Sequence, residues 1–360
     1  MKPIGILDEH PAWSDRLIAE LDRRRLPWER IDHARHGFDP GDREPRFSVV
    51  VNRTSPSSHT RGHRAVLFYT EPLLAHYESL GIPIVNPLAA YRFEKSKALQ
   101  IDLFERLGVP YPRTRVVNHV DEIPGAARRL GPPVLVKPNV GGSGAGIVRF
   151  DALGELEAAT AALDLGPDHT ALVQEYVEPA DGAVVRVEVL DGRVLYAIRI
   201  VRSDPGRFNL CPADLCEVPP GTPVAPVTAC AAAPALAVTR AEPAPEAADA
   251  AIRLARAASI DVGGVEYLTG ATDGRIRIYD VNATSNFVAD APAVLGFDPF
   301  PPLVDLILRR ASEGGRALDG PAMLGSPWPW IPAPPTSAWT PRPSTARTRS
   351  RTARSGRSGS

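Results

Sequence analysis

Val134-Leu-Val-Lys-Pro-Asn-Val-Gly-Gly-Ser-Gly-Ala-Gly146 is the stretch that decides the fold of this chain. Its apolar start predicts a strand that delivers Lys137, and a glycine-rich loop and a second strand at 147–150 follow. Backbone N–H groups of a flexible loop between two strands can surround an anion, while a lysine contributes a positive point charge. The stretch therefore predicts a phosphate-binding loop.

Two familiar phosphate-binding loops fit this stretch poorly. A P-loop requires Gly-Lys-Ser or Gly-Lys-Thr followed by a helix, and this sequence has neither. A dinucleotide-binding loop also precedes a helix, whereas residues 147–150 (Ile-Val-Arg-Phe) are β-branched and aromatic, as in strands. Both interpretations are weak.

A strand and a hairpin further along carry polar residues suited to a nucleotide. Residues 171–177 (Ala-Leu-Val-Gln-Glu-Tyr-Val) predict a strand whose end combines apolar and hydrogen-bonding character. The Asp-Gly pair at 191–192 predicts a hairpin turn, with Arg186 and Arg199 on its two arms, and Asn209 follows.

Two later segments, 263–267 and 279–282, predict paired strands that carry Glu266, Asp280 and Asn282. Asp280 and Asn282 are two residues apart, so their side chains point to the same face of a strand. Oxygen ligands opposite a phosphate loop suit Mg²⁺, which binds through few carboxylates plus substrate phosphates. The alternative is a set of polar residues beside a Thr-Asp-Gly turn.

Taken in this order, the motifs resemble the ATP-grasp superfamily. Within it they are similar to ligases that add amino acids to peptides, proteins or carrier-bound amines, such as the glutamate ligase of a ribosomal protein and the lysine-biosynthesis ligases. Each motif alone is weakly specific, but the ordered series is strongly so, and it covers about residues 86–308. The resemblance implies an α/β (α+β) ATP-grasp fold that uses ATP and Mg²⁺, with Mn²⁺ as an alternative ion.

The resemblance also assigns roles to individual residues. It implies that the nucleotide is bound by Lys97, Lys137, Gly141, Gly142, Ser143, Gly144, Gly146, Gln174, Glu175, Tyr176, Val177, Glu178 and Asn209. It implies that Lys137, Arg186 and Arg199 are catalytic, with the arginines directed towards the γ-phosphate and the incoming carboxylate. It implies that Glu266, Asp280 and Asn282 hold the metal.

Structural roles remain open for several of these residues. Lys97 sits on a predicted helix at 91–107, where a lysine is usually a solvated charge. Lone arginines on strands, such as Arg186 and Arg199, are usually solvent-facing or paired. Glu178 can equally be an exposed loop acid.

The same resemblance predicts the domain organisation. Residues 1–90 are expected to form a Rossmann-like pre-ATP-grasp domain, residues 114–177 a mobile lid, and residues 91–113 with 178–320 the core. Residues 321–360 are rich in Pro and Arg and cannot bury enough apolar surface to fold. They predict a disordered, solvated tail, and the alternative is a basic segment that binds RNA or acidic partners.

Short apolar runs at 4–7, 48–52, 65–69 and 82–85 predict the strands of the first domain, and residues 13–25 predict an amphipathic helix. Strands separated by helical segments indicate a parallel sheet.

Several other segments are interpreted from their own sequence alone. Residues 52–54 (Asn-Arg-Thr) are interpreted as a surface loop rather than a substrate contact. Residues 121–130, 153–163 and 246–259 predict helices, and residues 217–245, rich in Ala and Pro, predict an irregular excursion.

The segment 207–216 departs from the resembled ligases. Asn209 matches the family, but Cys211, Pro212 and Cys216 replace the expected basic, glycine-containing loop, which leaves the acceptor substrate open. A structural zinc site is disfavoured because no second cysteine cluster or suitably spaced histidine is present. A small buried thiol is favoured.

Composition sets the class of protein. With 360 residues, 44% of them hydrophobic, the chain can bury a substantial core, and its net charge of −1 gives no bulk field towards nucleic acid or membranes. Three cysteines fit a reduced cytosol better than a disulfide scaffold. No apolar run approaches transmembrane length, and Asp8-Glu9 falls where a signal peptide needs its apolar region, so we expect a cytoplasmic protein.

We hypothesise an ATP-dependent carboxylate–amine ligase acting on an amino acid or small peptide-like substrate. A substrate carboxylate would attack the γ-phosphorus of ATP to give an acylphosphate and ADP, and an amine would then displace phosphate to form an amide. Small-molecule carboxylate and amine substrates are the expected partners, and the oligomeric state is open. The alternatives are an ATP-binding regulatory or scaffold protein without ligase activity, and a phosphoryl-transfer enzyme.

Overall fold

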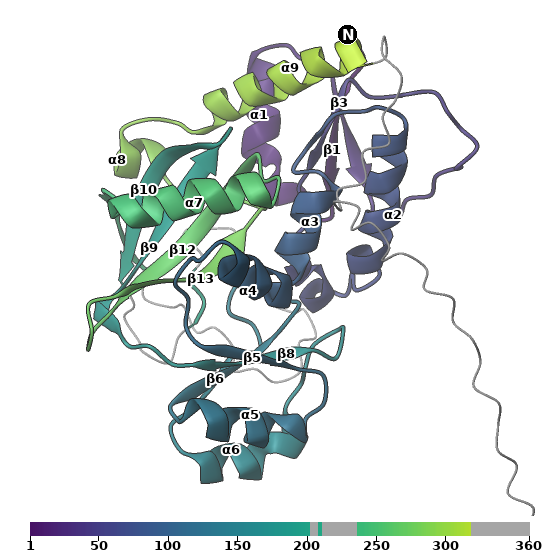
Figure 1. Cartoon of the computed structure of the whole chain (residues 1–360). Coiled ribbons are helices and arrows are strands. Elements are labelled where there is room, and N and C mark those ends of the chain that lie inside the picture. The colour runs from purple at the N-terminus through teal and green to yellow at the C-terminus, as the bar shows by residue number, and fades with distance from the viewer. Residues whose placement is uncertain (202–207, 211–235, 318–360) are drawn as a thin grey trace, which may run out of the picture. The chain divides into compact units, whose positions relative to one another are not determined.

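The computed structural model describes residues 1–201, 208–210 and 236–317. They belong to one compact unit, Met1–Gly320, and the remaining unit, Pro321–Ser360, lies outside the described residues. The predictions made for Cys211, Pro212, Cys216 and the tail therefore also lie outside them. The described unit contains three β-sheets, each with its own helices (Figure 1).

The first sheet is parallel, as predicted, with the strand order β2-β1-β3-β4. Its elements are β1 (Ile4–Asp8), β2 (Trp28–Asp32), β3 (Val49–Asn52) and β4 (Ile84–Val85), with η1 (Pro11–Trp13), α1 (Asp15–Arg23), η2 (Pro56–Arg61) and α2 (Val66–Ser79). The edge strand β2 was not predicted, because its sequence Trp-Glu-Arg-Ile-Asp is only partly apolar and it is only partly buried.

The prediction of a strand at 65–69 is wrong, because these residues begin helix α2. The buried residues Val66, Thr70, Leu73, Leu74 and Tyr77 recur at helical spacing and continue beyond the short apolar run. A run of five apolar residues cannot by itself distinguish a strand from a buried helix.

The single helix predicted at 91–107 is two helices, α3 (Leu88–Lys95) and α4 (Lys97–Arg106). Ser96 has extended backbone angles between them and caps α4, its side chain accepting a hydrogen bond from the Leu99 N–H. This break makes Lys97 the first residue of α4. The start of α4 lies beside the loop that follows β6 (Val134–Pro138), where the Asn139 side chain accepts a hydrogen bond from the Ala98 N–H.

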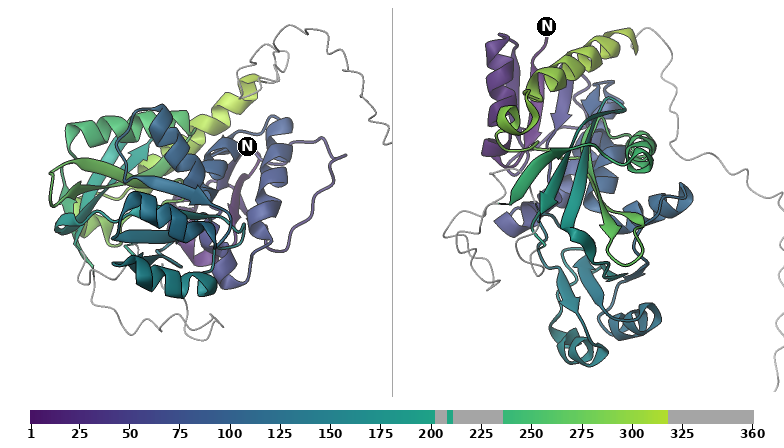
Figure 2. Two further views of the ribbon diagram at one scale, coloured as in Figure 1. Left: turned by 60° about the horizontal axis from the view of Figure 1, so that its bottom comes forward. Right: turned by 90° about the vertical axis from the view of Figure 1, so that its left-hand side faces the viewer.

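The second sheet is antiparallel, with the order β5-β8-β6-β7. Its remaining elements are β5 (Thr114–Val117), β7 (Val148–Phe150), β8 (Ala171–Glu175), α5 (Glu122–Leu130), α6 (Leu153–Ala159) and η3 (Thr160–Ala162). Helices α5 and α6 lie together on one face of this sheet and share an apolar core with it (Figures 1 and 2). The opposite face therefore remains available to the rest of the unit.

The third sheet is antiparallel, with the order β11-β10-β9-β12-β13. Its elements are β9 (Pro179–Leu190), β10 (Arg193–Val201), β11 (Ala237–Ala241), β12 (Val262–Gly270) and β13 (Ile276–Asn282), with α7 (Pro245–Ala257), α8 (Ala291–Leu295) and α9 (Phe300–Ala317). Strand β11 lies inside the stretch predicted to be irregular, so that prediction is wrong for residues 237–241. The hairpin of β9 and β10 turns at Asp191-Gly192, as predicted, and both residues have positive φ.

Helix α7 crosses one face of the third sheet (Figure 1) and packs against it together with α4. Helices α8 and α9 contribute to the apolar core on the other face, together with β1 and β3. Polar side chains nevertheless lie within two inner strands of this sheet, Arg186 and Glu188 on β9 and Glu266 on β12. None of the described helices is long and apolar enough to cross a membrane.

Candidate active site

A cavity of about 130 Å³ brings together residues from the second and third sheets, from helices α3 and α4, and from the first domain. Ten of the predicted site residues line it: Lys97, Lys137, Gly141, Gly142, Ser143, Gly144, Arg186, Glu266, Asp280 and Asn282. The glycine loop comes from the second sheet, and the acids and Asn282 from β12 and β13 of the third. The first domain contributes Trp13, Ser55 and Pro56.

The glycine loop is shaped by the need for close backbone approach at Gly144. This residue has φ +71°, and a Cβ there would overlap the carbonyl group of Phe208. Phe208 itself lines the cavity, so the loop and the 208–210 segment form adjoining parts of its wall. Only glycine satisfies both the backbone angle and the packing at this point.

Lys97 reaches the acidic part of the cavity from the start of α4. Its Nζ lies 2.5 Å from Oδ1 of Asp280, on β13. Burial opposes the charge of Lys97, but the neighbouring carboxylates of Asp280, Glu94 and Glu266 outweigh it and raise the pKa of the lysine. Lys97 is therefore a fixed positive charge inside the cavity, and the solvated-helix interpretation is wrong.

Lys137 is also buried, at 6% exposure, despite its position at a strand end. Its Nζ lies 5.7 Å from the centroid of the Tyr279 ring, within the range of a cation–π contact. Burial, with the charge of Lys97, lowers the pKa of Lys137 to about 8. A cation held at such a cost is expected to serve a negatively charged ligand.

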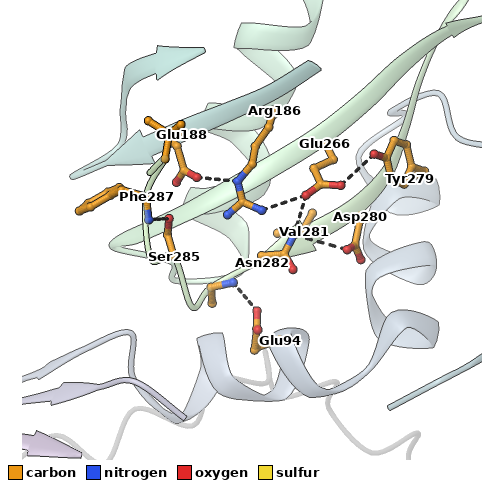
Figure 3. A network of polar contacts seen from close by, with 12 residues as sticks. Glu94, Arg186, Glu188, Glu266, Tyr279, Asp280, Val281, Asn282, Ser285 and Phe287 are labelled. Atoms are coloured by element: carbon orange, nitrogen blue, oxygen red, sulfur yellow. Dashed lines mark hydrogen bonds and ion pairs between the residues drawn. The ribbon is translucent and has the colours of Figure 1, made fainter. Parts of the chain in front are cut away.

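Arg186 is bracketed by two carboxylates at the centre of the site (Figure 3). Its Nε donates to Glu188 Oε1 at 2.5 Å, and its Nη1 donates to Glu266 Oε1 at 2.9 Å. A Cβ at position 264 would overlap the guanidinium, so Gly264 makes room for it. Burial alone would lower the pKa of Arg186, but the two carboxylates raise it.

The three predicted metal ligands lie together. Glu266 and Asp280 face each other across the β12–β13 ladder, and Nδ2 of Asn282 lies 3.4 Å from an oxygen of each. The two ends of an amide side chain are assigned from such contacts, so turning this amide would present its oxygen instead.

This donor set fits Mg²⁺. The described residues contain no group of three or more His, Cys, Asp or Glu side chains arranged for a metal. Two carboxylates and one amide are nevertheless the oxygen ligands that Mg²⁺ takes when nucleotide phosphates supply the others.

Some predicted residues do not line the cavity. Gly146, Gln174, Glu175, Tyr176, Val177, Glu178, Arg199 and Asn209 are not among the described residues that line it. Arg199, on β10, faces Val185 in the register of the third sheet.

The predicted adenine segment is already engaged in the second sheet. The backbone N–H of Glu175 donates to the Arg113 carbonyl, and that of Tyr176 donates to the Pro133 carbonyl. The Gln174 side chain donates to Thr114, and Arg113 pairs with Glu175. The adenine contacts therefore stay a prediction that rests on other backbone groups, including those of Val177.

Several lining residues were missed from the sequence. Glu94, on α3, is buried, accepts a hydrogen bond from the Ala283 N–H, and has its pKa raised by burial to about 7. The Tyr279 hydroxyl donates to Glu266 Oε2 at 2.8 Å. Their proximity to Lys97 and Asp280 in the sequence was the available signal. Further lining residues come from the segment 284–287 that follows β13.

Comparison with known proteins agrees with this geometry. Residues 94–217 match the family model of the RimK-like ATP-grasp domain. The chain is 31% identical over 160 residues to a probable alpha-L-glutamate ligase of Teredinibacter turnerae and 28% identical over 160 residues to one of Vibrio vulnificus. Each match covers 44% of this chain and 50% of the relative, so the chain spans about half the length of these curated relatives.

Solved structures share the fold over a larger part of the chain. The ATP-grasp ligase PsnB complexed with its minimal precursor has a TM-score of 0.60 at 19% identity, covering 86% of this chain and 99% of that one. The D-cycloserine synthetase DcsG gives 0.60 at 18% identity with the same coverage. D-alanine–D-alanine ligase of Bacillus anthracis gives 0.58 at 16% identity, covering 89% and 100%. These likenesses confirm the predicted ATP-grasp fold.

Proposed function

From the RimK-like ATP-grasp domain that this chain carries, we infer that the protein is an ATP-dependent carboxylate–amine ligase. The curated relatives named alpha-L-glutamate ligase and the ligases among the structural neighbours support this reaction class. The activity would join an acid and an amine through an amide bond, with release of ADP and phosphate. Amino acids or small peptide-like molecules are the proposed substrates.

The observation that carries the proposal is the arrangement of three cations, Lys137 and Arg186 buried and Lys97 partly buried, beside three oxygen-bearing side chains around one cavity. Lys97, Lys137 and Arg186 line the cavity beside Glu266, Asp280 and Asn282. Transfer of a phosphoryl group needs little covalent chemistry from the protein, because positioning and charge neutralisation supply most of the catalysis. In this cavity the glycine loop would position the phosphates, and the three cations would neutralise their charge.

ATP would place its phosphates beneath the glycine loop, with Lys97 and Lys137 beside them. Glu266, Asp280 and Asn282 would hold Mg²⁺, which supplies charge neutralisation of the phosphates when it is bound. Residues 174–178, at the end of β8, are proposed to contact the adenine, and Arg199 and Asn209 to act near the phosphates or the incoming carboxylate. These last assignments rest on the family resemblance.

In the first step, a carboxylate oxygen of the donor substrate attacks the γ-phosphorus, and the bond to the bridging oxygen of ADP breaks. Lys97, Lys137 and Arg186 would neutralise the charge on the transferred group. In the second step, the amine nitrogen of the acceptor attacks the acyl carbon, phosphate leaves, and the nitrogen loses a proton. The lid, residues 114–177, is proposed to exclude water, which would hydrolyse the acylphosphate.

We further propose that the reaction takes place in the cytoplasm on small-molecule substrates. Glutamate is the first donor to test, because the curated relatives are named for it. A peptide acceptor is the second class to test, because one structural neighbour was solved with a minimal precursor.

The proposal is tested by measuring Mg²⁺-dependent ADP release by the purified chain against pools of amino acids, with hydroxylamine present to trap an acylphosphate. ADP release that depends on one pool, together with a hydroxamate, supports a ligase and begins to identify the acid. Tight ATP binding without ADP release in any pool contradicts it and favours an ATP-binding regulatory protein. A stable phosphorylated product favours phosphoryl transfer alone.

A further inference from the structure

One side of the cavity is formed by residues to which the proposed mechanism assigns no role. Trp13 and Ser55 come from the first domain, and Thr284, Ser285 and Asn286 follow β13. Hydrogen bonds hold these residues together around the segment 53–55, since Thr284 Oγ1 donates to the Thr54 carbonyl. This group, Trp13, Ser55 and 284–286, is named the loop side of the cavity.

The side chain of Arg53 donates hydrogen bonds to three residues of the loop side. Its Nη1 donates to the Ser285 carbonyl, and its Nη2 donates to the Trp13 carbonyl at 2.9 Å and to Asn286 Oδ1. The segment 52–54 is therefore buried, with Arg53 at 3% exposure, and its interpretation as a surface loop is wrong. The hydrogen bonds of Arg53 to Ser285 and Asn286 join residues more than two hundred positions apart, so neighbouring sequence could not predict them.

The charge of Arg53 is not balanced by a direct ion pair. No acidic residue in the described part of the chain lies within 4.0 Å of its guanidinium. The carboxylates of Asp8 and Glu188 attract the guanidinium from farther away. Its Nε has no hydrogen-bond partner there. Burial lowers the pKa of Arg53 to about 10, so the side chain remains protonated at neutral pH. A buried cation without a direct ion pair is stabilised further when an anion approaches it.

Asn286 connects this charge to the cavity. An arginine only donates hydrogen bonds, so the amide atom that faces Arg53 is the oxygen. The amide NH₂ group of Asn286 must then point away from Arg53, and Asn286 lines the cavity. The geometry thus offers N–H donors, backed by a buried positive charge, on a side of the cavity whose lining residues carry no carboxylate.

We propose that Asn286, held by Arg53, binds a carboxylate group of the acceptor substrate. This inference rests on the proposed function, in which the reacting carboxylate lies beside the phosphates, Lys97 and Lys137. The loop side then receives the second substrate, an amino-acid or peptide acceptor with a free carboxylate. Asn286 is the residue that distinguishes such an acid from an amine without a carboxylate, and Arg53 is its positioning residue.

The test is Asn286→Asp, assayed with the twenty L-amino acids as acceptors and with their carboxamides. The variant keeps an oxygen towards Arg53 and adds a counter-ion, so its fold is expected to be maintained. It removes the N–H donors and neutralises the guanidinium. We expect the KM of the free-acid acceptor to rise at least tenfold, with the KM of the carboxamide and of ATP changing less than threefold.

The matched control is Asn118→Asp, which makes the same change at an exposed position outside the cavity and is expected to leave all three KM values unchanged. A merely structural Arg53–Asn286 contact predicts that Asn286→Asp raises the Tm while the preference for free acids over carboxamides stays as in the wild type. That result would overturn the proposal.

A binding measurement separates this proposal from the proposed function. Saturation-transfer NMR with the same acids and carboxamides, in the presence of ADP and Mg²⁺, needs no turnover. An acid preference that is present in the wild type and absent in Asn286→Asp supports the binding site even if no ligase activity is found. Equal binding of acids and carboxamides by the wild type overturns it even if the ligase is active.

Discussion

Nζ of Lys97 lies 2.5 Å from Oδ1 of Asp280, although 183 positions of sequence separate the two residues. The contact joins the first residue of α4 to β13, and both residues line the cavity. A lysine proposed to contact the nucleotide phosphates and a proposed metal ligand thus share one hydrogen bond. The proposed nucleotide site is therefore assembled from distant parts of the chain, and the charges of its residues depend on one another.

Lys97→Met is expected to impair the use of ATP because it removes a partly buried positive charge from the cavity. We expect kcat/KM for ATP to fall by about 10²–10³, the range found when one group that stabilises a transition state is removed. The measurement is steady-state ADP release over a range of ATP concentrations.

Lys95→Met is the matched control for that change. Lys95 is two residues away, pairs with Glu71 and does not line the cavity. Its removal should alter kcat/KM by less than about threefold, the effect of a single partly exposed pair. Equal losses in the two variants would show that Lys97 has no special role.

Lys137→Met should separate function from stability. Burial lowers the pKa of Lys137 to about 8, so the folded protein carries this charge at pH 7 at a cost. Removing the charge while keeping the length of the side chain is expected to raise the free energy of unfolding by about 1–3 kcal/mol. The same change should abolish turnover, since the cation would no longer face the phosphates.

Denaturant unfolding and ADP release, measured on the same preparation, check both expectations for Lys137→Met. Unchanged turnover in this variant would refute the assignment of Lys137. A variant that is both inactive and less stable than the wild type would show that the lysine serves packing instead.

Gly144→Ala is expected to displace the glycine loop, because a Cβ would overlap the Phe208 carbonyl and because φ is +71°. Affinity for ATP, measured by calorimetry, should fall at least tenfold. Gly182→Ala is the control, since Gly182 has φ +60° but open space around it. It carries the same backbone strain, of order 1 kcal/mol, without the overlap. If both variants bind ATP as the wild type does, the loop does not bind phosphate.

His33 predicts a pH dependence of stability in the first domain. Burial lowers the pKa of His33 from 6.5 to about 4, and its Nε2 contacts Thr54 Oγ1 at 3.1 Å. The unfolded chain therefore binds a proton at a higher pH than the folded chain does. Stability that is complete above about pH 6.5 is lost as the pH falls towards 4, by up to about 3 kcal/mol from this group.

His33→Gln should reduce that loss, because glutamine does not titrate and can still bond Thr54. Urea unfolding at pH 7 and pH 4.5 gives the comparison. An identical loss of stability in wild type and variant would assign the acid sensitivity to other groups.

The parts of the site that the sequence predicted are those with local signals. The glycine loop after Lys137 and the alternation of Asp280 and Asn282 on one strand are visible within a few residues. Pairing of the strands at 263–267 and 279–282 then places Glu266 opposite Asp280 without further information. These features depend on backbone conformation and on strand periodicity, both of which act over short distances.

The parts that could not be predicted depend on contacts between distant segments. Burial of Arg53 requires Ser285 and Asn286, and Glu266, one of the two carboxylates that flank Arg186, lies on another strand, β12. The misassigned strand at 65–69 has a different cause, since its apolar run is too short to show a period. Tertiary contacts and run length therefore limit what the sequence can show.

The central claim is that a substrate carboxylate becomes an acylphosphate. It is tested most directly with the acid identified in the ADP-release screen, labelled with ¹⁸O in its carboxylate, together with ATP, Mg²⁺ and the amine acceptor. Mass spectrometry of the released inorganic phosphate should find one ¹⁸O atom per phosphate, because the carboxylate oxygen that attacked the γ-phosphorus leaves with it. Phosphate without ¹⁸O, formed alongside ADP and product, would contradict carboxylate activation and the ligase mechanism proposed for this cavity.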